Sequence, residues 1–205
     1  MAMNKQQGAQ LVLVLGGARS GKSTFAEQLA AHSNGMVAYI ATAQANDDDM
    51  RDRIARHRAA RPSDWSTLEE PLHIADAVRR ATECANVVIL DCATTWLSNW
   101  FFAREDGAHL DEETITAQHY DSALAEIKVL TQALATLPAD KTVIVVSNEV
   151  GLGIVPAYAL GRVYRDVLGL VNQQLARAAQ RVYLMIAGLG VDIKRLHEEA
   201  LGRRA

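Results

Sequence analysis

The chain has 205 residues, of which 49% are hydrophobic, and its 21 basic and 24 acidic side chains give a net charge of −3. This length suits one domain with a buried core, and the charge provides no overall positive field that would favour a nucleic-acid or membrane-surface partner. We therefore expect a small substrate. No eighteen apolar residues follow one another, and residues 1–10 carry no apolar signal segment. Cys84 and Cys92 form no C-x-x-C pair, so we expect a cytoplasmic protein.

Apolar runs alternate with helical patterns along the whole chain. The predicted strands are residues 11–15, 36–41, 87–90, 143–146 and 182–186, and the predicted helices are residues 23–32, 47–60, 73–83, 95–103, 114–137 and 161–179. Continuous apolarity is typical of strands that are buried on both faces. The alternation predicts an α/β fold of the P-loop NTPase type, a single domain whose mostly parallel sheet carries helices on both faces. We expect residues 1–9 to be a flexible extension, residues 10–205 to form the domain, and the charged tail after Lys194 to fray.

The first predicted strand leads into a glycine-rich loop with the pattern G-x-x-x-x-G-K-S. Its residues are Gly16, Gly17, Ala18, Arg19, Ser20, Gly21, Lys22 and Ser23. Glycines let successive backbone N–H groups face a phosphate, the lysine reaches the β and γ oxygens, and the serine hydroxyl is placed to ligate Mg²⁺ at a positive helix terminus. The alternative is a glycine turn with a surface lysine, but the position between a strand and a helix favours nucleotide binding.

The helix predicted over residues 47–60 begins with acidic residues and continues with arginines, as the helix dipole favours. Arg53, His57 and Arg61 have the spacing of residues on one helix face. An imidazole can act as a nucleophile, and arginines suit phosphate oxygens. From these residues alone, a surface charge cluster and a phosphate-handling site both remain open.

Acidic residues follow two of the later predicted strands. Asp91 comes after residues 87–90, where P-loop enzymes place the acid that holds Mg²⁺; the less favoured alternative is an acid that caps or turns the segment after it. Glu149 comes after residues 143–146 in a loop that contains Gly151, Gly153 and Pro156. That loop either contacts the substrate or only turns the chain.

Four segments together resemble one family, the bifunctional adenosylcobinamide kinase/adenosylcobinamide-phosphate guanylyltransferases of cobalamin biosynthesis. They are residues 16–23, 39–43, 53–62 and 148–156, and the likeness extends over about residues 11–193. The resemblance implies that the protein phosphorylates adenosylcobinamide with ATP or GTP. It then transfers GMP from GTP to that phosphate through a guanylylated histidine, which gives adenosylcobinamide-GDP. The matching histidine here is His57, which follows Arg56 where some relatives have a second histidine.

The same resemblance implies the remaining site residues and partners. The residues that would contact the nucleotide are the loop at 16–23, Ala41, Thr42, Ala43, Arg58, Ala59, Ala60, Arg61, Glu69 and Asp91. Ser23 and Asp91 would hold Mg²⁺, Lys22 and His57 would be catalytic, and the protein would form a ring-like homo-oligomer. Two other hypotheses remain, a plain small-molecule P-loop kinase and a GTP-dependent binding switch, although we recognise no guanine-specific N-K-x-D sequence.

Overall fold

The computed structural model describes residues 8–33, 35–44, 48–59, 61–103 and 117–202, and every structural statement below refers to these residues. They form seven strands and seven helices in chain order. These are β1 Gln10–Gly16, α1 Lys22–Ala31, β2 Val37–Ala41, α2 Asp48–Ala59, β3 Ser66–Glu69, α3 Ile74–Cys84, β4 Val87–Asp91, α4 Ala93–Ala103, α5 Ala117–Thr136, β5 Thr142–Asn148, α6 Ala159–Ala178, β6 Arg181–Ile186, β7 Leu189–Asp192 and α7 Ile193–Ala200. All five predicted strands and all six predicted helices are present, with ends that differ by a few residues.

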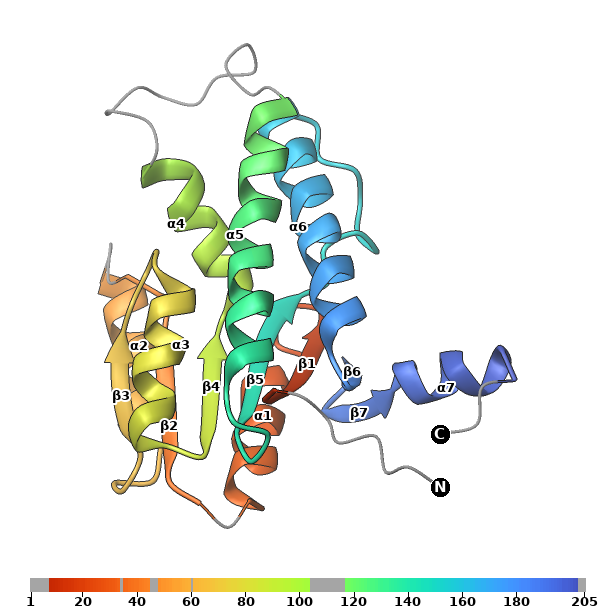
Figure 1. Cartoon of the computed structure of the whole chain (residues 1–205). Coiled ribbons are helices and arrows are strands. Elements are labelled where there is room, and N and C mark those ends of the chain that lie inside the picture. Colours follow the sequence, from red (N-terminus) through yellow and green to blue (C-terminus); the bar gives the residue numbers. More distant parts are fainter. Residues whose placement is uncertain (1–7, 34, 45–47, 60, 104–116, 203–205) are drawn as a thin grey trace.

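The strands form one sheet in the order β3-β2-β4-β5-β1-β6-β7. Every neighbouring pair is parallel except β6 and β7, which are antiparallel. The prediction of a single α/β domain with a mostly parallel sheet is therefore confirmed (Figure 1). Because β4 and β5 lie between β1 and β2, the loops that follow β1 and β2 begin about 14 Å apart at the usual strand spacing.

The two faces of the sheet have separate hydrophobic cores. Alternate strand residues such as Leu13, Ile40 and Val145 pack with apolar residues of α3, α4, α5 and α6. The intervening residues, such as Val14 and Tyr39, pack with α1 on the opposite face. Side chains of successive strand residues point to opposite faces, so continuous apolar runs supply both cores at once. Figure 1 shows α5 and α6 side by side across one face.

Three elements differ from the sequence-based expectations. β3 and β7 were not predicted: β3 is an edge strand whose residues are mostly exposed, and β7 contains Gly190 and has no buried residue. The tail after Lys194 was expected to fray, but it continues α7, whose N-cap Asp192 accepts a hydrogen bond from the Arg195 amide. The strands β3 and β7 bury little surface, so they leave only a weak hydrophobic pattern in the sequence.

The first described residues are packed rather than frayed. Gly8 and Ala9 are buried, and the Ala9 amide donates to the Leu134 carbonyl oxygen at 3.0 Å. The predicted flexible extension is therefore wrong for these two residues, and residues 1–7 lie outside the described part of the chain. Among the described helices, none combines the length and apolar character that a bilayer crossing requires.

Candidate functional site

The glycine-rich loop joins β1 to α1 in a conformation that depends on left-handed backbone angles. Gly16 and Gly21 have φ of 154° and 94°, and Arg19 has φ of 56°. A Cβ atom on Gly16 would lie 2.7 Å from the Met185 carbonyl oxygen, so this position has no room for a side chain. The backbone is thus shaped around a close approach to β6, and the positive N-terminus of α1 opens at the end of the loop.

Lys22 and Ser23 occupy the first turn of α1. The Lys22 side chain is 8% exposed, and its ammonium group donates to the Gly17 carbonyl oxygen at 2.6 Å. The Ser20 hydroxyl is buried and has no hydrogen-bond partner in the described part of the chain. The Ser20 carbonyl accepts from the Gly188 amide at 3.1 Å, which ties the loop to the β6–β7 turn. The predicted loop is present, with a lysine and two hydroxyl groups at the terminus of a helix.

Asp91 ends β4 next to the end of β2. Its Oδ2 accepts a hydrogen bond from the Tyr39 hydroxyl at 2.5 Å. Thr42 joins the same two strand ends, because its amide donates to the Asp91 carbonyl oxygen and its hydroxyl bonds both the amide and the carbonyl of Cys92. The Thr42 carbonyl accepts from Asn99 at 2.7 Å. The completely buried Thr42 therefore holds Asp91 in place, and its expected contact with a nucleotide stays a prediction.

Arg61 lies against Tyr39. The Arg61 guanidinium carbon is 3.3 Å from the centroid of the Tyr39 ring, and the buried Nε atom has no hydrogen-bond partner among the described residues. The residue spacing predicted that Arg61 and His57 share one helix face. This prediction is wrong, because α2 ends at Ala59. The Arg61 amide instead closes a turn onto the Arg58 carbonyl at 3.3 Å, and the side chain reaches the sheet.

Burial and charge act on the ionisable groups around Arg61. Burial raises the pKa of the Tyr39 hydroxyl, and the Asp91 charge and hydrogen bond raise it further, so Tyr39 keeps its proton at neutral pH and donates it in the hydrogen bond to Asp91. Burial also raises the pKa of Glu27 on α1, while Arg61 lowers it and Asp91 adds a smaller increase. Arg61 is thus a cation placed near two acidic groups and an aromatic ring.

His57 is an exposed residue in the last turn of α2. Its neighbour Arg58 is also exposed and forms a 3.8 Å ion pair with Glu69 at the end of β3. The structure therefore brings together two predicted nucleotide contacts that are distant in sequence. The side chains of Arg53 and Arg56 are not described, and Ala60 lies outside the described residues.

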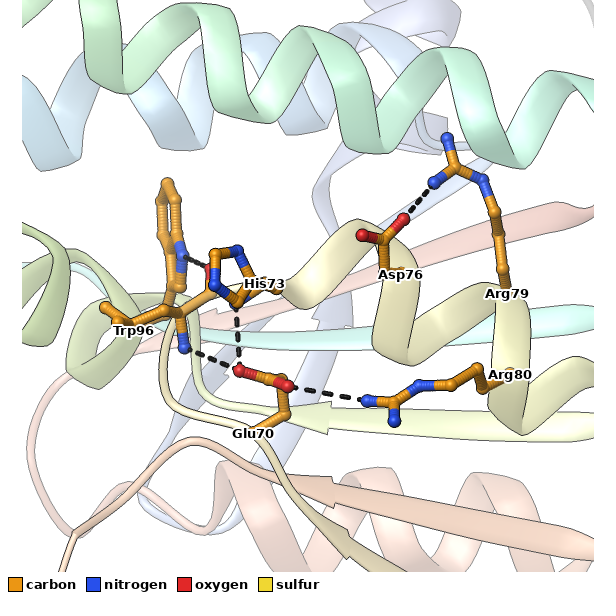
Figure 2. Close-up of polar contacts among 7 residues, drawn as sticks. Glu70, His73, Asp76, Arg79, Arg80 and Trp96 are labelled. Atoms are coloured by element: carbon orange, nitrogen blue, oxygen red, sulfur yellow. Dashed lines mark hydrogen bonds and ion pairs between the residues drawn. The ribbon is translucent and has the colours of Figure 1, made fainter.

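Glu70 fixes the chain directly after Glu69. One carboxylate oxygen accepts hydrogen bonds from the Leu72 and His73 amides at 3.1 and 3.0 Å, and the other pairs with Arg80 at 3.4 Å (Figure 2). Burial raises the pKa of Glu70, but the two amides, His73 and Arg80 together hold it below its usual value. The Trp96 indole donates to the Leu72 carbonyl at 2.9 Å, so the same loop is tied to α4.

Sequence reasoning assigned no role to Glu70. An acid that closely precedes a predicted helix is the signal that could have identified it, because such carboxylates accept hydrogen bonds from amides without partners at a helix start.

Glu149 mainly closes its own turn. Its carboxylate accepts from the Gly151 amide at 2.6 Å, and its amide donates to the Gly16 carbonyl at 3.0 Å. Asn172 of α6 lies behind this segment, where it accepts from the Ser147 hydroxyl and donates to the Asn148 carbonyl. These contacts favour the interpretation that Glu149 turns the chain. They also place its loop next to the glycine-rich loop.

The predicted residues therefore form two adjoining groups along the carboxyl ends of the parallel strands, where open α/β sheets bind ligands. One group is the loop at 16–23, which follows β1, and Asp91 lies between the two groups at the end of β4. The other contains the end of α2, Arg61 and Glu69. Ala41 ends β2 and Ala43 follows it, between the two groups.

Comparisons with known proteins identify what the chain resembles. The sequence model described as "Cobinamide kinase / cobinamide phosphate guanyltransferase" matches residues 12–193. The bifunctional adenosylcobalamin biosynthesis protein CobP of Pseudomonas aeruginosa is 44% identical over 182 residues, which are 89% of this chain and 96% of the relative. The CobU protein of Escherichia coli with the same description is 44% identical over 185 residues, 90% of this chain and 99% of the relative.

Among solved structures, a prototypical ATPase from the type III secretion system of pathogenic bacteria superposes with a TM-score of 0.54 at 12% identity. The match covers 92% of this chain and 57% of that one. At this level of identity the likeness concerns the fold alone.

Proposed function

Because the chain belongs to the cobinamide kinase/cobinamide phosphate guanyltransferase family, and so combines two transfer activities of adenosylcobalamin biosynthesis, we propose how its residues divide the two reactions. The loop at 16–23 with Asp91 serves phosphoryl transfer to adenosylcobinamide. His57, with Arg58 and Arg61, serves guanylyl transfer to the resulting phosphate. The observation that supports this division is the separation of β1 and β2 by two strands, which gives each group its own part of the strand ends.

The first group has the properties that phosphoryl transfer requires. Backbone amides of the glycine-rich loop and the N-terminus of α1 would surround the β and γ phosphates. The Lys22 ammonium, held within 2.6 Å of the Gly17 carbonyl, would exchange that contact for phosphate oxygens. Positioning and charge stabilisation account for most of the catalysis in such reactions, because the transferred phosphoryl group needs little covalent help.

The residues present also fit a magnesium ion. The Ser23 hydroxyl and the Asp91 carboxylate are hard oxygen donors of the type that Mg²⁺ prefers. No group of three or more His, Cys, Asp or Glu side chains in the described part of the chain could hold a metal by itself. Phosphate oxygens and water would complete the shell of a Mg²⁺ ion here, and the ion would neutralise charge on the β and γ phosphates.

The second group fits a covalent transfer. An imidazole nitrogen of His57 attacks the α-phosphorus of GTP, a P–N bond forms, and the bond to pyrophosphate breaks. An oxygen of the adenosylcobinamide phosphate then attacks the same phosphorus, which releases His57 and gives adenosylcobinamide-GDP. Arg58 and Arg61 can bind phosphate oxygens during both steps, since guanidinium groups match their geometry.

GTP labelled at the α-phosphorus tests this assignment directly. The wild-type protein should acquire an acid-labile, alkali-stable label, whereas His57→Ala should acquire none and should keep its kinase activity. His197→Ala is the matched control, because His197 is another exposed histidine on a helix. Label that persists in His57→Ala, or kinase activity that disappears with it, would contradict the proposed division.

A further inference from the structure

Tyr39 lies between the two groups that the proposed function assigns to different reactions. It is 2% exposed on β2, on the sheet face that α1 covers. Its hydroxyl contacts Asp91, and its ring contacts Arg61. A single buried side chain thus touches the acid of the kinase group and an arginine of the guanylyl-transfer group.

The hydroxyl contact restricts the Asp91 carboxylate. The torsion that turns a carboxylate about its last bond has a broad energy profile, so a free aspartate has no fixed oxygen direction. The 2.5 Å hydrogen bond from Tyr39 occupies Oδ2 and so determines where Oδ1 points. Thr42 holds the backbone at the same place, because its amide donates to the Asp91 carbonyl at 3.0 Å.

The ring contact places the Arg61 guanidinium. The 3.3 Å distance from the guanidinium carbon to the ring centroid is that of a stacked cation–π pair. The buried Nε atom of Arg61 has no protein partner among the described residues, and Glu27 is close enough for its carboxylate charge to interact with Arg61. The remaining N–H groups of a guanidinium in this position are donors for an anionic ligand.

We propose that Tyr39 is a positioning residue for both reactions: its hydroxyl orients Asp91 for phosphoryl transfer, and its ring orients Arg61 for guanylyl transfer. This inference rests on the proposed function, because it assumes that Asp91 and Arg61 belong to the two groups. Tyr39 acts through its contacts with Asp91 and Arg61. It fixes the relative position of two side chains, one at the end of β4 and the other in the connection between α2 and β3.

Two substitutions separate the two contacts. Tyr39→Phe removes the hydroxyl and keeps the ring, and Tyr39→Leu removes both. Tyr183→Phe is the matched control, because Tyr183 packs on the same face of the sheet, where its ring makes an edge contact with Phe25. The measurements are kinase kcat and KM, binding of a fluorescent GTP analogue with EDTA present, and labelling of His57 by α-labelled GTP.

We expect Tyr39→Phe to lower kinase kcat about tenfold, as the loss of one hydrogen bond to a charged group predicts, with little change in KM. Metal-free binding of the GTP analogue and labelling of His57 should stay within about twofold of the wild type, because the cation–π contact remains. Tyr39→Leu should in addition weaken metal-free binding about fivefold to tenfold and slow the labelling of His57. Tyr183→Phe should match the wild type in every assay.

Wild-type kinase kcat in Tyr39→Phe would overturn the role of the hydroxyl. Equal metal-free binding in the Phe and Leu variants would overturn the role of the ring. If Tyr39→Leu does not fold, Tyr39→Met replaces it, because the flexible Met side chain adapts to irregular core space, and it should weaken metal-free binding as the loss of the ring predicts. A wild-type protein without label on His57 would contradict the proposed function, whereas kinase and metal-free binding would still test Tyr39.

Discussion

Replacing Asn172 with alanine should destabilise the protein strongly, although the residue lies on a helix behind the site. The Asn172 side chain is 5% exposed on α6. Its amide nitrogen donates to the Asn148 carbonyl at 2.9 Å, and its oxygen accepts from the Ser147 hydroxyl at 2.7 Å. These two bonds connect α6 to the carboxyl end of β5, so Asn172→Ala removes a direct link between helix and sheet.

The magnitude follows from the two bonds and their burial. Each hydrogen bond contributes about 0.5–1.5 kcal/mol net, and a buried group that loses its partner costs about 1–3 kcal/mol. Ser147 is completely buried and retains a contact with the Thr94 hydroxyl at 3.4 Å, which limits its cost. We therefore expect a loss of about 2–4 kcal/mol in the free energy of unfolding, or about 5–15 °C in Tm for a chain of this size.

Urea unfolding followed by tryptophan fluorescence measures this loss, because Trp96 and Trp100 are buried in the core beside α6. Gln173→Ala is the matched control, since Gln173 is the next residue of α6 and its side chain is exposed. The control should remain within about 0.5 kcal/mol of the wild type, as surface substitutions usually do. An Asn172→Ala variant as stable as the control would refute the reasoning, because its two bonds would then contribute nothing.

Two further predictions concern the glycine-rich loop and the turn after β3. Gly16→Ala should weaken binding of a fluorescent GTP analogue at least about tenfold, because its Cβ would lie 2.7 Å from the Met185 carbonyl. Gly169→Ala on α6, whose Cβ would meet no atom within 4 Å, should bind as the wild type does, and equal binding by both variants would contradict this. Glu70→Gln should lower the free energy of unfolding at neutral pH by about 1–2 kcal/mol. Because the pKa of Glu70 is held below its ordinary value of 4.5, this difference in stability should persist above pH 4.5 and disappear as the pH falls through the lowered pKa. Urea unfolding at several pH values measures it. A pH-independent difference, or a similar loss in the exposed control Glu83→Gln, would exclude the charge of Glu70 as the cause.

The role proposed for His57 would explain how one small domain accommodates two transfers. His57 lies on the connection between β2 and β3, and the glycine-rich loop lies on the connection between β1 and α1. Both connections leave the carboxyl edge of the sheet, and the end of β4 with Asp91 lies between them. The two proposed groups share one edge of the sheet and therefore would require no second domain.

The sequence by itself determined the elements whose evidence is local. Five buried strands could be predicted because their residues are apolar on both faces. The loop at 16–23 could be predicted because phosphate binding needs glycines, a lysine and a hydroxyl at fixed spacing. Asp91 was predicted from its place after a strand, and the family resemblance to cobinamide kinase/guanylyltransferases was confirmed by the family match. The roles of His57 and the other individual site residues stay predictions.

Only the tertiary structure decided the contacts between residues that are far apart in sequence. Tyr39 reaches Asp91 across 52 positions, Arg58 reaches Glu69 from a different element, and Arg61 leaves the predicted helix face to stack on Tyr39. The strand order and the packing of α1 create these contacts, and neither leaves a periodic pattern along the chain. The strands β3 and β7 were missed for a related reason, since they bury too little apolar surface to leave a clear pattern in the sequence.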